Sequence, residues 1–139
     1  AGDCSLHGGN VMQHPKDSGK YPHGKTGLSR IFHTLIHSRD GFIATFRGEA
    51  AFRQLLLLHT LLIIAAFVLD ISKVERALVL AVCFISLLVE LLNSAIEAVV
   101  DRISLEQHPL SKNAKDMGSA AQTTALLMVG AVWGVILQG

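Results

Sequence analysis

Four side chains between positions 90 and 101 are of types that bind metals or transfer protons, and their spacing places them together on one face of a helix. Glu90, Asn93, Glu97 and Asp101 lie at offsets 0, 3, 7 and 11. At 100° per residue they fall at roughly 0°, −60°, −20° and +20°, an arc of about 80°. We call these four residues the carboxylate stripe.

The stripe lies in an otherwise apolar segment, where charge is costly. An ionised carboxylate near the centre of a bilayer costs about 2.5–3.5 kcal/mol on insertion scales. A metal ion, a basic side chain or a water-filled cavity would compensate for that cost. We therefore interpret the stripe as a functional site rather than a structural feature.

Three apolar runs must position the stripe. They cover roughly 50–69, 76–100 and 119–137, each near the length of about 20 residues that crosses a bilayer as a helix. The stretch 29–47 has apolar residues at helical spacing and a cationic side, which is typical of a helix lying in the membrane interface; an amphipathic helix packed on protein is the alternative. The sequence predicts an all-α membrane protein, and a net charge of +1 gives no basic surplus for nucleic acid.

The basic residues predict the orientation. Ten of the 12 Lys and Arg residues lie before the apolar core of the first span or in the second loop, so the N-terminus and that loop should be cytoplasmic. Asp101 then lies at the cytoplasmic surface, with Glu97 about 6 Å and Glu90 about 16 Å deeper. Such a stripe suits a reaction between a water-soluble cytoplasmic reagent and a membrane-embedded one.

The connections and glycines suggest how the spans pack. Asp70 and Ser72 are candidate caps in the first turn. The segment 101–116 reads as a long polar connection. Gly130 and Gly134 form a small-xxx-small pair that favours close helix approach, and three thin spans favour a homo-oligomer.

Two further polar pairs leave alternatives open. Glu49 and Arg53, at i and i+4, form either an intrahelical ion pair or part of a divalent-cation site shared with Glu97. Lys115 and Asp116 suit phosphate binding, or a helix start capped by Asp116 or Ser119.

Three features of the N-terminal part of the sequence are not used to predict the function. Residues 1–26 resemble a tail without apolar periodicity. Within them, 19–26 matches the phosphate-loop pattern but lacks the preceding strand that the motif needs. His33 and His37 are spaced to hold a metal, but no acidic ligand is in register.

The sequence resembles the prokaryotic diacylglycerol kinase family. The resemblance rests on Glu90-Leu-Leu-Asn93-Ser-Ala-Ile-Glu97-Ala-Val-Val-Asp101, on Glu49-Ala-Ala-Phe-Arg-Gln54 and on Ala114-Lys-Asp-Met-Gly-Ser-Ala-Ala121. It covers about four-fifths of the chain, residues 27–139, without a gap.

The resemblance implies a homotrimer with shared active sites in the bacterial inner membrane, using ATP and Mg²⁺ to phosphorylate diacylglycerol to phosphatidic acid. By analogy Glu90 is the general base, Glu49 and Glu97 hold the metal, and Asn93 and Asp101 support them. The residues expected to contact ATP are Arg30, His37, Glu49, Glu97, Glu106, His108, Lys115 and Asp116. The residues expected on the lipid side are Arg30, Arg53, Gln54, Glu90, Ser119 and Trp133.

The chain departs from the family pattern at His37, where an aromatic residue is common, and in the loop 104–109, which lacks the usual Gly and Tyr. Two other functions are alternatives: an undecaprenol kinase, or a non-enzymatic ion- or proton-conducting oligomer. Lys115 and Asp116 argue against a pore, which has no need of them.

Overall fold

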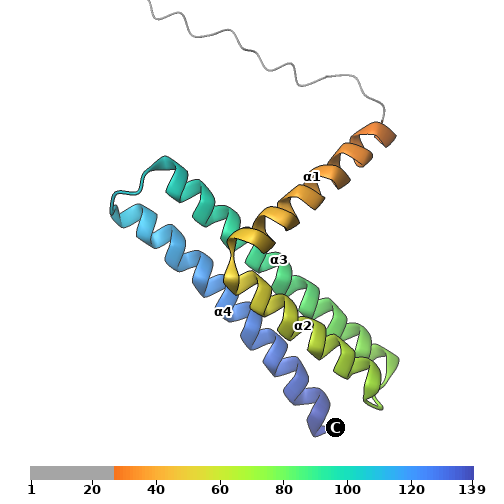
Figure 1. Cartoon of the computed structure of the whole chain (residues 1–139). Coiled ribbons are helices and arrows are strands. Elements are labelled where there is room, and N and C mark those ends of the chain that lie inside the picture. The colour runs from red at the N-terminus through yellow and green to blue at the C-terminus, as the bar shows by residue number, and fades with distance from the viewer. Residues whose placement is uncertain (1–26) are drawn as a thin grey trace, which may run out of the picture. The chain divides into compact units, whose positions relative to one another are not determined.

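Four α-helices account for the regular structure of residues 27–139, the part of the chain that the computed structural model describes. They are α1 (Gly27–Gly48), α2 (Ala50–Val68), α3 (Lys73–Ile103) and α4 (Pro109–Gln138) (Figure 1). The predicted tail and the pattern at 19–26 lie outside the described residues. The helices α2, α3 and α4 are long and apolar enough to cross a membrane, which confirms the predicted all-α membrane class.

The described residues divide into two units, one ending at Ile36 and one beginning at His37. In the first, the Thr34 hydroxyl donates a hydrogen bond to the Arg30 carbonyl oxygen at 2.8 Å. In the second, α2, α3 and α4 run antiparallel to their neighbours in sequence (Figure 1). The segment 37–48 of α1 leads into α2, and the Phe42 and Phe52 rings meet with centroids 6.5 Å apart.

Two sets of polar contacts stabilise the turn between α2 and α3. Ser72 caps α3 as predicted: its hydroxyl accepts from the Glu75 backbone N–H at 3.1 Å, and the Glu75 carboxylate accepts from the Ser72 N–H at 2.8 Å. Arg76 donates from Nε to the Ala66 carbonyl oxygen at 2.8 Å and stacks over the Phe67 ring at 5.4 Å. These contacts satisfy carbonyl groups that the end of α2 leaves open.

The core lies in the half of the bundle next to this turn. Ala66 from α2, Val79 and Cys83 from α3, and Val129 and Trp133 from α4 are all buried in one cluster. Cys83 packs there as a small apolar residue, which is common for a free thiol.

The start of α4 differs from the prediction. The segment 109–118 is helical rather than part of a long connection, so only residues 104–108 join α3 to α4. The cap is His108, whose Nδ1 accepts from the Leu110 N–H at 3.1 Å, and not Asp116 or Ser119. Pro109 at the first helical position suits a helix start because it has no N–H to leave unpaired.

Gly118 marks a close approach of two helices within the chain. A Cβ atom on Gly118 would overlap the Asn93 side chain, lying 3.2 Å from its Cγ. Gly130 and Gly134 have nothing within 4 Å of such an atom. At Gly118, α4 therefore packs directly against the carboxylate stripe of α3.

Candidate active site

The carboxylate stripe lies on α3 and becomes more exposed toward its end. Glu90 is buried at 5% exposure, Asn93 and Glu97 are partly buried, and Asp101 is exposed. The Asn93 Nδ2 group donates to Glu97 Oε1 at 3.4 Å. Burial against the neighbouring helices therefore increases along the stripe from Asp101 to Glu90.

Glu90 lies in a groove of about 470 Å³ that is lined by residues from α2, α3 and α4. Its polar lining includes two of the predicted lipid-side residues, Gln54 from α2 and Ser119 from α4, with Asn93 and Gln122 beside them. The remaining lining is apolar: Ala51, Leu55 and Leu58. A polar centre in an apolar groove suits the head of a lipid.

The Glu90 carboxylate has no hydrogen-bond donor or ion-pair partner among residues 27–139. Glu97 and Glu49 are close enough to act on it electrostatically. A buried carboxylate left unpaired beside a groove is available to accept a proton from a bound hydroxyl.

Glu49 occupies the junction of α1 and α2. It stands at the cap position of α2, but its side chain makes no capping hydrogen bond. It borders a hollow of about 500 Å³ together with Ser94 and Ala98 of α3. Its carboxylate therefore faces the span that carries the stripe.

The predicted ion pair between Glu49 and Arg53 does not form. Arg53 instead donates from Nη1 to the Phe46 and Arg47 carbonyl oxygens at 2.8 and 3.3 Å, and none of the ion pairs of the described residues includes Glu49. This leaves the metal-binding interpretation of Glu49, and it gives Arg53 a structural role at the end of α1.

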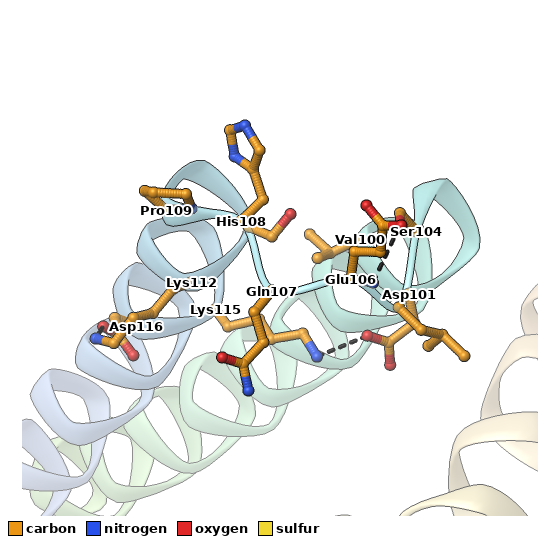
Figure 2. Close-up of a pocket in the computed structure, with 12 residues that line it drawn as sticks. Val100, Asp101, Ser104, Glu106, Gln107, His108, Pro109, Lys112, Lys115 and Asp116 are labelled. Atoms are coloured by element: carbon orange, nitrogen blue, oxygen red, sulfur yellow. Dashed lines mark hydrogen bonds and ion pairs between the residues drawn. The ribbon is translucent and has the colours of Figure 1, made fainter.

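A second cavity, of about 630 Å³, lies where α3 meets α4 beyond the stripe (Figure 2). Lys115 and Asp101 face each other across it with Nζ 2.6 Å from Oδ1, and Lys112 pairs with Asp116 at 2.5 Å. The short loop adds Glu106 and His108 to the lining. Five of the residues predicted around ATP or supporting the site thus share one cavity: Asp101, Glu106, His108, Lys115 and Asp116.

Both lysines lie in the polar first turns of α4, ahead of its apolar run. The hydrogen bond to Asp101 raises the pKa of the Lys115 amine, and the bond to Asp116 raises that of Lys112. Both amines therefore stay protonated at neutral pH, as phosphate binding requires. Glu97 also acts on Lys115 electrostatically, which links the cavity to the stripe.

The acids also fit a magnesium ion that is shared with a nucleotide. No group of three or more metal-binding side chains occurs in the described part of the chain. Mg²⁺ bound with phosphates needs only one or two carboxylates, since phosphate oxygens and water complete its shell. Glu49 and Glu97 supply that number of hard oxygen donors.

Four predicted residues of the unit that begins at His37 line none of the three cavities described above: His37, Arg53, Glu97 and Trp133. Arg30 belongs to the unit that ends at Ile36, and His37 is exposed on α1. Trp133 is 9% exposed in the core cluster, about 21 Å along α4 from Ser119 at 1.5 Å per residue. Their roles stay predictions.

One lining residue was missed by the sequence reasoning. Gln122 is 8% exposed, and both polar atoms of its amide lack a partner. The available signal was the one used for the stripe, a polar residue inside an apolar run.

An unpaired buried carboxylate in a helical membrane protein, with a lysine-lined cavity on the same helices, is typical of an enzyme active site. The profile of the family described as prokaryotic diacylglycerol kinase matches residues 36–137. The chain belongs to this family.

The names of similar proteins agree with this family assignment. A protein of Pseudomonas aeruginosa named diacylglycerol kinase is 64% identical over 116 residues, which cover 84% of this chain and 94% of that protein. Proteins with the same name from Escherichia coli K12 and Helicobacter pylori J99 are 43% and 40% identical, over 81% and 83% of this chain and 92% and 90% of their own lengths. These similarities support a kinase and do not favour the undecaprenol or pore alternatives.

Proposed function

We propose that this chain is an ATP-dependent kinase that phosphorylates diacylglycerol to phosphatidic acid in the bacterial inner membrane. The observation that carries the proposal is the unpaired Glu90 carboxylate in a groove that all three spans line. Family membership and the names of the relatives support the choice of lipid.

In the proposed reaction Glu90 accepts the proton of the lipid's primary hydroxyl. The hydroxyl oxygen forms a bond to the γ-phosphorus of ATP, the bond from that phosphorus to the bridging oxygen breaks, and ADP leaves. Such transfers depend on positioning and charge neutralisation more than on covalent help. Gln54 and Ser119, which line the same groove as Glu90, would contact the lipid.

The phosphate side of the reaction falls to the residues nearer the surface. Lys115, oriented by Asp101, places a positive charge at the second cavity, within electrostatic reach of Glu97. Glu49 and Glu97 would hold Mg²⁺, which when bound supplies charge neutralisation on the β- and γ-phosphates. Asn93 orients Glu97 through its hydrogen bond.

The remaining predictions complete the proposal. The N-terminus and the loop between α3 and α4 face the cytoplasm, where ATP is present, because that side carries most of the basic residues. Residues 27–139 form the membrane domain, and 1–26 a tail. Three chains assemble with shared active sites, which native mass spectrometry of the purified protein would detect as a trimer.

The direct test is transfer of labelled phosphate from ATP to lipid by the purified full-length chain in bilayers. We expect labelled phosphatidic acid from diacylglycerol, loss of the label when Mg²⁺ is chelated, and a much lower rate with undecaprenol. If neither lipid is labelled, the kinase proposal is wrong.

The metal assignment has its own test. Glu49→Gln and Glu97→Gln should raise the Mg²⁺ concentration needed for half-maximal rate. Glu75→Gln, in the turn at the far end of α3, is the matched control because Gln also supports a capping box, and it should leave that concentration unchanged. An unchanged Mg²⁺ requirement in both site variants would remove the metal role.

A further inference from the structure

Gln122 is a buried amide without a partner, and it lies beside Glu90. It is 8% exposed, and neither Oε1 nor Nε2 has a hydrogen-bond partner among the described residues. A buried polar group left unpaired costs about 1–3 kcal/mol, so an amide in this position calls for a ligand. Gln122 and Glu90 line the same groove.

The helix register places the amide at the depth of Glu90. Gly118 lies beside Asn93, and α3 and α4 are antiparallel (Figure 1). Counting three residues along each helix from that contact puts Glu90 level with Ala121, so Gln122 is about 1.5 Å deeper at most. A lipid whose hydroxyl reaches Glu90 therefore presents its neighbouring atoms to Gln122.

The surroundings of Gln122 favour a ligand that accepts a hydrogen bond. Residues 27–139 place no cation in the groove, whose other members are Gln54, Asn93, Ser119 and apolar side chains. A primary amide donates through Nε2 and is neutral, so it suits a carbonyl oxygen better than a phosphate. Diacylglycerol carries an ester carbonyl next to its reacting hydroxyl, whereas a prenol carries none.

We propose that Gln122 is a specificity-determining residue whose amide donates a hydrogen bond to an ester carbonyl of the lipid, next to the hydroxyl at Glu90. The chain thereby favours lipid alcohols that carry an ester over those that do not. This inference rests on the proposed kinase function and adds a basis for its choice of substrate.

The test compares a diacylglycerol with the dialkyl ether of the same chain length, offered together to the purified full-length protein in bilayers. An ether oxygen accepts hydrogen bonds more weakly than an ester carbonyl, while the hydroxyl is the same. We expect kcat/KM to favour the diester by about tenfold, which corresponds to one hydrogen bond of about 1.4 kcal/mol. Gln122→Leu should remove that preference by slowing the diester alone.

A ratio measured in one reaction does not depend on the fraction of active protein, so partial unfolding of the variant does not affect it. Thr124→Val is the matched control, since Thr124 is exposed on the same helix, and it should keep the preference. Equal rates for the two lipids with the wild-type chain overturn the inference, as does a preference that survives in Gln122→Leu. Both outcomes leave the kinase function standing, whereas no labelling of either lipid refutes the function itself.

Discussion

Replacing Gly118 by Ala tests whether the close contact between α3 and α4 positions the active site. The added Cβ would overlap Asn93 Oδ1 and lie 3.2 Å from its Cγ and 3.9 Å from its Cα. The backbone contact is tolerable, so the side chain of Asn93 must rotate away. It would then lose its 3.4 Å hydrogen bond to Glu97, a proposed metal ligand.

The expected effect on stability is small because two terms oppose each other. Overpacking typically costs about 1–3 kcal/mol, and the cost should lie near the lower limit because the displaced atom ends a side chain. Ala gains about 0.5–1 kcal/mol over Gly within a helix. The net change should therefore be within about 1 kcal/mol, while the Mg²⁺ requirement and the turnover of the kinase change clearly.

The assay measures lipid phosphorylation and thermal denaturation of the same preparation. Gly130→Ala is the control, since the chain leaves open space at that position, and it should be as active as the wild type. In the double variant Asn93→Ala with Gly118→Ala, the second substitution should have no further effect on turnover, as expected for residues that act through one contact. Full activity of Gly118→Ala with an unchanged Mg²⁺ requirement would refute this reasoning.

Three further predictions concern single contacts. Arg76→Ala should lower the free energy of unfolding by about 1–3 kcal/mol, because it leaves the Ala66 carbonyl oxygen and its neighbours at the end of α2 without a donor. Turnover per folded molecule should not change. An unaltered melting temperature would argue against this function of Arg76. Ser72→Ala should cost about 0.5–2 kcal/mol by the same denaturation measurement, since it removes the capping hydroxyl. Asp101→Asn should lower the pKa of the Lys115 amine, because the hydrogen bond to Asp101 raises it. The protonated amine is lost as pH rises through its pKa, so the alkaline fall in kcat/KM for ATP should move to lower pH. A pH profile that does not move would show that Lys115 does not take part in ATP binding.

The sequence predicted the helices best where apolar runs define them. The first span was expected at 50–69 and α2 covers Ala50–Val68, because only His59 and Thr60 are polar between residues 55 and 69 and polar residues mark both ends. The cap at Ser72 was also predictable, since Ser is a preferred residue at the first cap position of a helix.

The beginning of α4 was missed because its first turns are polar. Residues 109–118 carry no apolar run, so hydropathy assigns them to a connection, although Pro109 signals a helix start. Packing against α3 and the His108 cap keep them helical, and hydropathy includes neither effect.

The tertiary contacts were the least predictable part of the site. Gly118 and the pair Gly130 and Gly134 look alike in sequence, and only the register of α3 against α4 distinguishes them. In the same way, the partners of Arg53 are carbonyl groups, which no pattern of side chains reveals. The stripe itself was predictable because it depends on one helix alone.

The central claim is that Glu90 is the base for phosphoryl transfer to lipid, and the rate of Glu90→Gln tests it most directly. The substitution keeps the size of the side chain and removes its ability to accept a proton. We predict a fall in kcat of about 10²–10⁴-fold, with Glu75→Gln at the wild-type rate. Phosphorylation of diacylglycerol by Glu90→Gln at the wild-type rate would contradict the account.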